Sequence, residues 1–332
     1  MKIVPVFLRN DYGIKSRGDS LELRGFLPAL KQITDEVCPF WFDEYLEDKK
    51  ELQKRVIEFI DGVRPDIVFF ILMEDEFSFE TLDYLKSKYL TVNWFGDDHW
   101  RFERFTKHYI PHFTRSITTD KYAVDKYESA GCKNVILSQW ASFGCIEDID
   151  FEEIKYKHDI SFIGGISEYR KWVMRELSKK GIKVECFGYG WENGKVSFEE
   201  LEDIFKTSKI NMNISNSAPY DIRYIFSSPE GMLEFIGTQK RAEQIKARNF
   251  EIPAFGGFQL TNYAPSLEDY LKIGDEVVIY KTIKELALRA NYYLNNEKER
   301  RRIMVNGYNR AKREHTYINR LKEVFDKIEN AL

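Results

Sequence analysis

The chain has 332 residues, of which 43% are hydrophobic and 31% are charged, and its formal net charge is −4. A chain of this length exceeds the usual size of a single hydrophobic core, so we expect two domains, and its composition argues against a disordered protein. Acidic and basic residues are interspersed without a basic block, which argues against a large nucleic-acid interface.

The first half alternates short apolar runs with helical segments. An amphipathic helix is expected to begin near Asp19, with Glu22 completing a capping box, and a second helix is expected over 47–62. The expected strands are 2–8, 36–42, 65–72, 89–95, 115–119 and 134–140. Strands that alternate with helices predict a parallel sheet that is covered by helices on both faces.

The acidic stretch 144–158 lacks periodicity and is predicted to be a linker, after which the same alternation restarts. The expected strands are 159–165, 183–191, 209–215, 258–262 and 276–280. The expected helices are 168–180, 198–206, 238–249, 282–295, 297–313 and 316–331. We therefore predict an α/β protein with two Rossmann-like doubly wound domains facing a central cleft, residues 1–145 and residues 155–315. Ligands of such sheets bind outside the carboxyl ends of the strands, so the loops after the strands should hold the site.

The cysteines predict a reducing compartment. Cys38, Cys132, Cys145 and Cys186 are widely spaced and form no C-x-x-C pair, so we expect reduced thiols and a cytoplasmic protein rather than a disulfide framework or a zinc site. The apolar run at the N-terminus is too short for a signal peptide, and no run of about 18 apolar residues predicts a membrane span.

Two glycine-containing loops follow strands in the second half. In FIGGISEYRKW (162–172), Gly164 and Gly165 would let backbone N–H groups approach an anion at a helix N-terminus, and Arg170 could reach a diphosphate. The alternative is a tight turn with solvated basic residues. In FGYGWENG (187–194), Tyr189 and Trp191 could stack on a base or sugar, or Trp191 could simply cover the turn.

In the first half, WFGDDHW (94–100) carries the densest polar group directly after a strand. Asp97, Asp98 and His99 suit general acid–base work, contact with a leaving group, or a metal; alternatively, they cap a helix and satisfy an imidazole. The acidic run 73–77 is expected to be a solvated loop, and His158 and His315 are expected at the surface. No Ser-His-Asp, P-loop or zinc spacing supports a hydrolase, a kinase or a metalloenzyme.

The stretch RNFEIPAFGGFQLTNY (248–263) places Glu251 inside an otherwise apolar segment, where a carboxylate needs a partner. Glu243 precedes it by eight residues, which on the expected helix would bring the two carboxylates to one face, with Lys246 and Arg248 between them. Glu251 is expected where that helix ends. An acid at a strand–helix junction can accept hydrogen bonds from two vicinal hydroxyls, which is what ribose recognition requires.

The sequence resembles GT-B glycosyltransferases over nearly its whole length, and most of all their CgeB-like spore-maturation branch, related to the retaining group 1 families. The C-terminal half resembles that branch through SFIGG, FGYGW, KINMNIS, IKARNFE, GGFQLT, EVVIY and HTY, in this order. The first half is similar to its acceptor-side domain through GDSLELRGFLPAL, TVNWFGDDHWRFE and SITTDKYAVDKY. This resemblance implies that the final helix packs back on the first domain.

The resemblance also implies residue roles. Glu251 would bind the ribose of a nucleotide-sugar donor, while Gly256 and Gly257 would leave room for its sugar or phosphate. Asp97, Asp98 and His99 would be catalytic, although they reverse the His–Asp order of the wider family, which leaves a retaining or inverting outcome open. The CgeB-like branch does not depend on the position of Glu243. The other expected donor-binding residues are Gly164, Gly165 and Lys246 with Arg170 around the diphosphate, together with Tyr189, Trp191 and Arg248.

The expected activity is therefore transfer of a hexose-type sugar from a nucleoside diphosphate sugar, for example a UDP-sugar, without a metal or another cofactor. A glycan, a lipid-linked sugar or a protein is expected as acceptor in preference to nucleic acid. The alternatives are a nucleotide-sugar epimerase or hydrolase on the same fold and a catalytically silent nucleotide-sugar-binding module.

Overall fold

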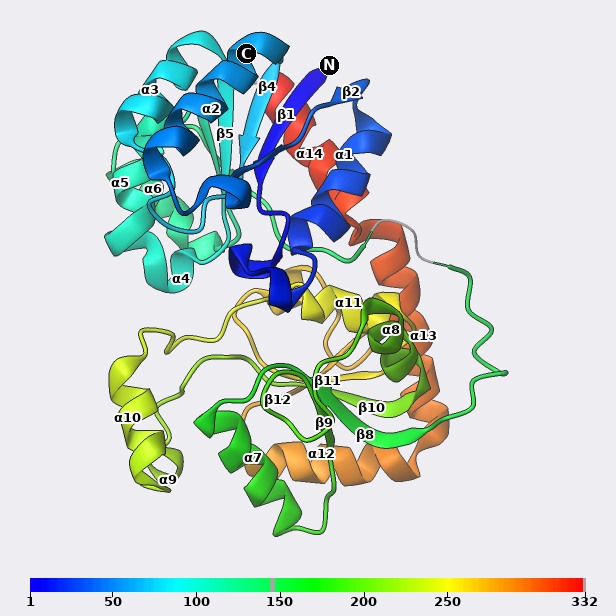
Figure 1. Ribbon diagram of the computed structural model, residues 1–332. Helices are drawn as coiled ribbons and strands as arrows, with labels where there is room; N and C mark the ends of the chain where they lie inside the picture. Colours follow the sequence, from blue (N-terminus) through cyan, green and yellow to red (C-terminus); the bar gives the residue numbers. More distant parts are fainter. Residues whose placement is uncertain (144–146, 331–332) are drawn as a thin grey trace. The chain divides into compact units, whose positions relative to one another are not determined.

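The computed structural model describes residues 1–143 and 147–330, and contacts between residues divide the chain into two compact units. Unit 1 holds the described residues up to Phe143 together with those from Thr316 onward, and unit 2 holds those between them, up to His315. Figure 1 shows that each unit is built on its own sheet, with helices on both faces.

Unit 1 contains a parallel sheet in the order β2-β1-β4-β5-β6-β7, with β3 also paired to β1. The predicted strand 36–42 is split into two short strands because Pro39 between them has no N–H to donate to the ladder. The strands are β1 (Lys2–Phe7), β2 (Glu36–Val37), β3 (Phe40–Trp41), β4 (Ile67–Phe70), β5 (Leu90–Phe95), β6 (Arg115–Thr118) and β7 (Val135–Leu137).

Helices cover both faces of this sheet because β1, β4 and β5 are apolar on both sides. One core lies beneath α2 and α3, and the other beneath α1 and α14, where Tyr317 packs on Phe26 with ring centroids 4.4 Å apart. The last helix of the chain thus belongs to unit 1. The helices are α1 (Leu27–Ile33), α2 (Lys49–Val63), α3 (Phe79–Lys88), α4 (Asp98–Arg101), α5 (Lys107–Tyr109), α6 (Val124–Ser129) and α14 (Tyr317–Glu329).

The predicted capping box at Asp19 is wrong by one residue. The Ser20 hydroxyl, not the Asp19 carboxylate, accepts a hydrogen bond from the N–H of Leu23, and a π-helical turn over Glu22–Phe26 then continues into α1. Ser20 also donates to the carbonyl of Leu8, which ties the start of this helix to the end of β1. A buried serine satisfies both partners at once, which a charged aspartate at this place cannot do.

Unit 2 contains a parallel sheet in the order β12-β11-β10-β8-β9. The strands are β8 (His158–Ile163), β9 (Glu185–Phe187), β10 (Ser208–Asn213), β11 (Gln259–Asn262) and β12 (Val278–Tyr280). Because the first strand in the chain lies between the second and the third, the direction of winding reverses between β8 and β10, and this pair is the switch point. Two parallel, doubly wound sheets confirm the predicted fold class.

The helices of unit 2 are α7 (Glu168–Ser178), α8 (Phe198–Thr207), α9 (Ile222–Ile225), α10 (Pro229–Gly237), α11 (Arg248–Ala254), α12 (Ile283–Asn295) and α13 (Glu297–Glu314). Of the predicted linker 144–158, residues 144–146 lie outside the described part of the chain, 147–157 form no helix or strand, and His158 already begins β8.

The predicted helix 238–249 is wrong. Residues 238–247 are irregular, α11 begins only at Arg248, and α9 and α10 precede the irregular segment. The Ser228 hydroxyl caps α10 by accepting from the N–H of Gly231, and Pro229 occupies its first turn. A serine followed by proline is a strong helix-start signal, and it places the helix about ten residues earlier than expected.

Gly25 offers a test of the packing between the last helix and unit 1. A Cβ atom at this position would lie 2.7 Å from Tyr317, a fully buried ring. Gly25→Ala should therefore lower the free energy of unfolding by about 1–3 kcal/mol in urea denaturation. Gly62→Ala is the matched control because no atom lies within 4 Å of its Cβ position in α2. It should leave stability unchanged or raise it by up to about 1 kcal/mol. Equal effects of the two substitutions would contradict the described packing of α14.

Candidate functional site

Arg170 spans the switch point of unit 2. Its Nη1 donates to the carbonyl of Gly165 after β8, and its Nη2 donates to the carbonyl of Ile214 after β10, each at 2.7 Å. Burial, followed by the nearby charge of Arg248, lowers the pKa of this guanidinium to about 10. Within the described residues, its Nε has no hydrogen-bond partner. The side chain therefore joins the two strands and concentrates positive charge where ligands of such sheets bind.

Arg248 and Glu251 form a second charged group at this edge. The Arg248 Nε lies 3.2 Å from Glu251 Oε2 across the first turn of α11, and the Glu251 side chain is 8% exposed. Arg248 lies close enough to Arg170 for its charge to lower the pKa of that guanidinium, and Glu251 lies beside Arg248. Glu251 thus stands near the start of a helix, not where one ends, as the sequence had suggested.

Glu243 reaches the same edge from the irregular segment before α11. Its Oε2 accepts a hydrogen bond of 2.8 Å from the Asn262 amide, which in turn accepts one of 2.9 Å from the N–H of Ser215. Burial raises the pKa of Glu243, while hydrogen bonds from Ser215 and Ser217 and the charge of Arg170 oppose this. The predicted helical face shared with Glu251 does not exist, but a hydrogen-bond network holds Glu243 at the carboxyl ends of β10 and β11.

The glycine loops after β8 and β9 pack backbone against backbone. A Cβ on Gly188, where φ is 121°, would lie 2.4 Å from the carbonyl oxygen of Gly164, and one on Gly164 would lie 2.8 Å from Phe162. Gly165, in contrast, has no atom within 4 Å of its Cβ position, so a ligand can approach its backbone. Of the two glycines singled out in the sequence, Gly165 is therefore open, whereas Gly164 is packed against Phe162 and Gly188.

The two aromatic residues of the β9 loop differ in their surroundings. The Trp191 Nε1 donates to the carbonyl of Gly164 at 2.8 Å, and its ring meets Phe162 edge to face. Trp191 therefore covers the turn, as the alternative interpretation had it. Tyr189 is 71% exposed and is the aromatic ring of this loop that a base could stack on.

The N-terminus of α7 is closed by a carboxylate that the sequence did not single out. Glu234 of α10 accepts hydrogen bonds from the N–H groups of Glu168 and Tyr169, at 2.7 and 3.3 Å, and Ser167 caps the N–H of Arg170. The expected anion site on these N–H groups is thus filled by a side chain. Positive charge for an anion is supplied instead by the arginines at the switch point.

Gly256 and Gly257 do not join this edge. They lie between α11 and the amino end of β11, which is the opposite end of a parallel strand. A Cβ on Gly256 would lie 2.7 Å from Ile149, and one on Gly257 would lie 2.6 Å from Asn211. Their small size is explained by packing against the protein, and the expected room for a sugar or phosphate is not found there.

Lys246 does lie at the edge. Its N–H donates to the Asn249 Oδ1 at 3.0 Å, and this bond joins the irregular segment to the first turn of α11. The backbone of Lys246 is therefore fixed within one helical turn of Arg248 and Glu251. Lys246 thus belongs to the same segment as Arg248 and Glu251 at the start of α11.

The Asp97–Asp98–His99 group follows β5 in unit 1, and its members have different environments. Asp98 is fully buried and accepts hydrogen bonds from Thr106, Thr118 and Tyr127 at 2.6, 2.5 and 2.8 Å. Burial raises its pKa to about 6, against the effect of the three hydroxyls. All of its contacts are internal, so it fits the structural alternative better than a direct role in catalysis.

Asp97 and His99 are partly exposed on either side of this buried carboxylate. The carbonyl of Asp97 accepts from the N–H groups of Trp100 and Arg101, which begins α4. The His99 Nε2 lies 3.7 Å from the carboxylate of the buried Asp120. A carboxylate at this distance can help to orient the imidazole, as a general base requires.

Three residues that were expected at the surface are buried or mostly buried, although Glu74 and Asp75 of the acidic loop 73–77 are exposed as predicted. Glu76 in the acidic loop after β4 is buried, and both of its carboxylate oxygens accept from the N–H of Glu74. His315 is buried with its Nε2 2.7 Å from the carbonyl of Tyr270. The side chain of His158 is only 16% exposed and lies 2.8 Å from the Glu185 carboxylate.

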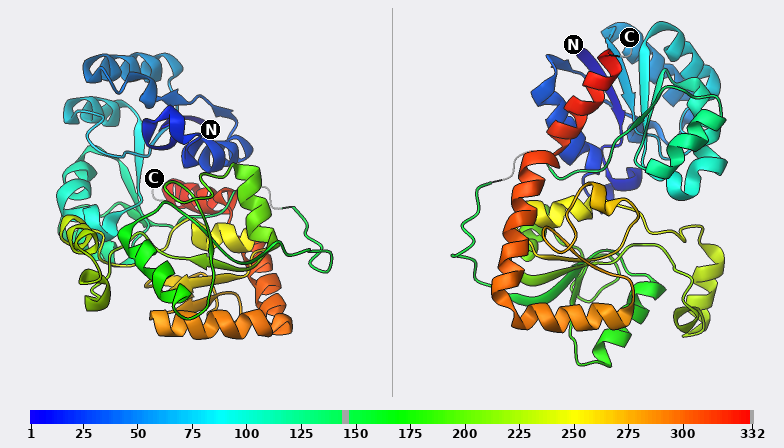
Figure 2. Two further views of the ribbon diagram at one scale, coloured as in Figure 1. Left: turned by 60° about the horizontal axis from the view of Figure 1, so that its bottom comes forward. Right: turned by 180° about the vertical axis from the view of Figure 1, so that it is seen from behind.

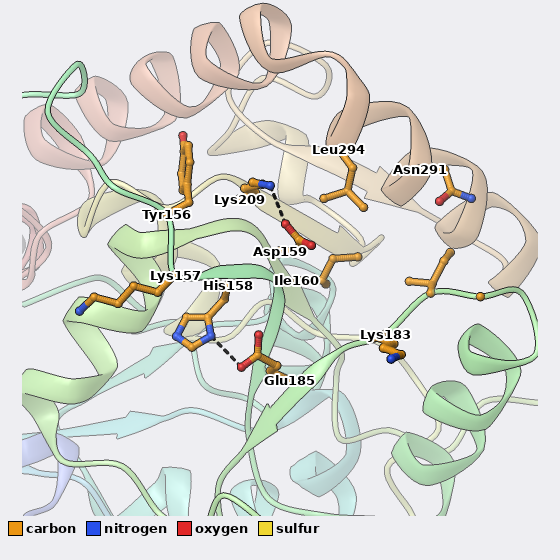
Figure 3. A pocket seen from close by; sticks show the side chains of 12 residues that line it. Tyr156, Lys157, His158, Asp159, Ile160, Lys183, Glu185, Lys209, Asn291 and Leu294 are labelled. Atoms are coloured by element: carbon orange, nitrogen blue, oxygen red, sulfur yellow. Dashed lines mark hydrogen bonds and ion pairs between the residues drawn. The ribbon is translucent and has the colours of Figure 1, made fainter.

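His158 and Glu185 line a cavity of about 590 Å³ (Figure 3). The cavity lies at the amino ends of β8, β9 and β10, whereas Arg170 bonds to the loops at their carboxyl ends. Lys209 in this cavity pairs with Asp159, and Lys157 at its rim pairs with Asp203. The charges of this cavity largely neutralise one another, and it lies away from the switch point.

Over the described residues, no group of three or more His, Cys, Asp or Glu side chains is placed to hold a metal ion. In the same part of the chain, Cys38, Cys132 and Cys186 are free thiols, while Cys145 lies outside it. No helix within residues 1–143 and 147–330 has the length and hydropathy that a membrane span needs.

Part of the chain resembles known glycosyltransferases. Residues 170–326, slightly less than half of the chain, match a family model described as glycosyl transferase-like. The match begins at Arg170 and includes Glu243, Arg248 and Glu251. No curated protein matches the sequence.

Solved structures of similar fold cover nearly the whole chain at low identity. The structure of Anabaena HepE in complex with UDP is 10% identical, has a TM-score of 0.61 and covers 99% of this chain and 100% of its own. Sucrose-phosphate synthase from Thermosynechococcus elongatus is 8% identical with a TM-score of 0.66, covering 100% of both chains. A Listeria monocytogenes protein described as a candidate UDP-N-acetylglucosamine 2-epimerase is 12% identical with a TM-score of 0.53, covering 100% of this chain and 97% of its own. These likenesses show a GT-B fold.

The buried carboxyl of Asp98 predicts a pH dependence of stability. Its pKa is about 6 in the folded protein against an ordinary value of 3.8, so the native state binds this proton more tightly than the unfolded chain. The resulting stabilisation is full below about pH 4 and is lost as the pH rises through 6. The stability of the wild type relative to Asp98→Asn should therefore fall by on the order of 3 kcal/mol between pH 4 and 7.

Urea denaturation of both proteins at several pH values measures this difference. Asp125→Asn, at an exposed position of α6, is the control, and its stability curve should run parallel to that of the wild type. A constant difference between wild type and Asp98→Asn over this range would show that the Asp98 carboxyl titrates normally.

Proposed function

We propose that this protein is a glycosyltransferase that uses a nucleoside diphosphate sugar as donor. The carrying observation is that Arg170, Arg248 and the buried Glu251 converge at the switch point of unit 2, inside the segment that matches a glycosyl transferase-like family. This combines positive charge for a diphosphate with a carboxylate for a ribose at the place where doubly wound sheets bind nucleotides.

Glu251 is the residue that we assign to the ribose. A carboxylate can accept hydrogen bonds from two vicinal hydroxyls at once, and its burial excludes competing water. Arg248 fixes the orientation of the Glu251 carboxylate through its contact at 3.2 Å. Tyr189, exposed on the neighbouring loop, is our candidate platform for the base.

The leaving diphosphate is assigned to the basic residues. Arg170, Lys246 and Arg248 would neutralise the charge that develops on the diphosphate as the glycosidic bond breaks, and the open backbone at Gly165 would let it approach. A fixed cationic site can supply this stabilisation without a metal, so we propose metal-independent transfer of a hexose, with activity that survives treatment with a chelator.

The residues of unit 1 are assigned to turnover. His99 beside Asp120 is our candidate base or acid toward the acceptor, and Asp97 is a candidate contact of the reacting groups. The buried Asp98 supports them by holding the start of α4. From the motifs around Asp97 and Glu251, we also propose that the protein belongs to the CgeB-like branch.

An epimerase or hydrolase acting on the same donors is the second candidate, since the fold is also that of the Listeria protein described above. A panel of nucleotide sugars separates the candidates. Nucleoside diphosphate release that depends on an acceptor supports transfer, release without one supports hydrolysis, and a changed sugar without release supports epimerisation. Binding without any reaction indicates a silent binding module, and the absence of binding to every donor contradicts the whole proposal.

Glu251→Ala should weaken binding of UDP or GDP, whichever the wild type binds, by tenfold or more in calorimetric titration. A charge-assisted hydrogen bond contributes about 1.5–3 kcal/mol, and two ribose hydroxyls would lose their acceptor. Glu185→Ala removes a carboxylate at the opposite edge of the same sheet and should leave nucleotide affinity unchanged. A Glu251→Ala protein that melts normally and binds nucleotide like the wild type would show that the donor site lies elsewhere.

His99→Ala should lower kcat by about 100-fold or more while nucleotide affinity stays within twofold, because removal of a general acid or base acts on the chemical step. Steady-state rates with the donor and acceptor found in the panel, beside calorimetric titration of the nucleotide, measure the two effects. His112→Ala, a histidine of unit 1 that pairs with Asp83, is the control and should keep its rate. Equal rates for both variants would remove His99 from the catalytic group.

A further inference from the structure

Unit 2 carries an exposed apolar surface on α9 and α10, which we call the α9–α10 lobe (residues 219–237). Figures 1 and 2 show the two helices standing off from the sheet of unit 2. Five large apolar side chains on it are 67% to 76% exposed, and the exposed apolar residues elsewhere in the described chain are scattered. Such a concentration marks an interaction surface. The five are Tyr220, Ile222, Phe226, Leu233 and Ile236, with Met232 beside them.

Specific contacts hold this lobe in place. Glu234 bonds to the N-terminus of α7 and also accepts from the hydroxyl of Tyr224, at 2.9 Å. The Tyr224 ring is fully buried in the core of unit 2 and packs against Tyr169 and Trp172. One face of the lobe is therefore anchored in the protein, while its apolar residues on the other face point outward. The exposure is a property of an ordered surface.

A cavity of about 490 Å³ begins where this lobe meets the carboxyl ends of β11 and β12. Its lining includes charged residues (Asp221, Arg223 and Lys281) as well as four tyrosines, a carboxylate and an amide: Tyr169, Tyr220, Tyr263, Tyr280, Glu243 and Asn262. Aromatic faces and hydrogen-bonding oxygens together suit a pyranose ring, which is apolar on its faces and polar at its rim. Glu243 belongs to the same hydrogen-bond network as Ser215 after β10, so the cavity adjoins the proposed donor site.

Arg241 stands at the boundary between the cavity and the lobe. Its guanidinium lies 5.3 Å from the ring centroid of Tyr220, a cavity residue, and 4.0 Å from that of Phe235 in α10. No ion pair of Arg241 with a carboxylate is found within the described residues, and its Nη1 has no hydrogen-bond partner there. A cation held between rings in this way suits a phosphate group.

We propose that the acceptor is an amphiphile, a saccharide joined through a phosphate to a hydrocarbon chain. The tyrosine-lined cavity takes the sugar, Arg241 meets the phosphate, and the apolar residues of the lobe take the hydrocarbon. This inference rests on the proposed glycosyl transfer and names its acceptor class. The three surfaces follow one another in the same order as the three parts of such a molecule, which is why we favour it over a protein partner or a second copy of this chain.

Alkyl glucosides of increasing chain length test this proposal, because they keep the sugar constant and change only the hydrocarbon. Calorimetric titration of the full chain, below the micelle-forming concentration, should show affinity that rises by up to about fourfold for each added methylene group, the gain expected for full burial. The triple variant Phe226→Ser, Leu233→Ser, Ile236→Ser should lose this dependence. Leu288→Ser, at a position of α12 that is 62% exposed, should keep it.

The sugar part is tested with the shortest glucoside and with the donor. Tyr220→Ala should weaken binding of methyl glucoside by fivefold or more, whereas Tyr292→Ala, on α12, should not. If the Tyr220→Ala substitution instead weakens only the binding of a nucleotide sugar and not of methyl glucoside, the cavity holds the donor's sugar and the inference is wrong.

Nucleotide binding keeps these outcomes separate from the proposed function. Every variant should retain the wild-type affinity for its nucleoside diphosphate, which also confirms folding. The inference is wrong if the affinity of the wild type for alkyl glucosides does not depend on chain length. It is also wrong if the triple variant keeps this dependence. In both cases the glycosyltransferase proposal stands. The same holds if the wild type self-associates in sedimentation experiments and the triple variant does not, because the lobe would then be a contact between copies.

Discussion

The proposed donor site depends on the two hydrogen bonds that the Arg170 guanidinium donates. The guanidinium donates to carbonyls that follow β8 and β10, the two strands between which the sheet reverses its direction. At a switch point, the loops of neighbouring strands diverge and leave a crevice, and a side chain that bonds to both sides sets its width. Both hydrogen-bond partners are carbonyls and not carboxylates, and the carboxylates of Glu234 and Glu243 offset the charge of Arg170 only from a greater distance. One residue therefore fixes the crevice and makes it electropositive.

The other groups of unit 2 are organised around this charge. Arg248 would repel Arg170, but its contact with the buried Glu251 compensates for that repulsion. The charge of Arg170 favours the ionised form of Glu243. The carboxylate of Glu234 binds the N-terminus of α7, where the helix dipole favours negative charge. The proposed donor site thus alternates in sign: the carboxylates that we assign to hydroxyl groups lie between the cations that we assign to phosphates. Such preorganisation holds the polar groups oriented before a ligand arrives.

The parts of this arrangement that could be predicted from the sequence are those that depend on local pattern. Continuous apolar runs such as β4 and the glycine-ended β8 identify the parallel sheets, and Glu251 was found because a carboxylate inside an apolar stretch requires a partner. Sequence patterns gave a wrong secondary structure where tertiary contacts determine the local conformation. Residues 238–247 have a composition that suits a helix, yet the Asn262 contact of Glu243 and the cap from Asn249 keep them irregular. The Ser228–Pro229 pair is a local signal for the start of α10.

Residue type alone could not separate equivalent candidates either. Asp97, Asp98 and His99 are adjacent in sequence, but only the fold shows that three hydroxyls occupy Asp98. Likewise, two glycine pairs looked alike, although Gly165 is open and Gly256 is in contact with Ile149. These differences arise from residues that are distant in sequence, such as Tyr127 and Ile149, and no local pattern encodes them.

The α9–α10 lobe shows how one carboxylate links two surfaces. Glu234 satisfies the N-terminus of α7, next to the donor site, and the same residue anchors the helix that carries the exposed apolar side chains. Burial of each such side chain would contribute about 1.5–3 kcal/mol. Apolar residues that stay exposed together at this cost are typical of an interaction surface. An anchor in the core, through Tyr224, keeps that surface ordered and adjacent to the sugar-sized cavity. The same structural element therefore closes the N-terminus of α7 to an anion and carries the apolar surface that we propose for a hydrocarbon chain.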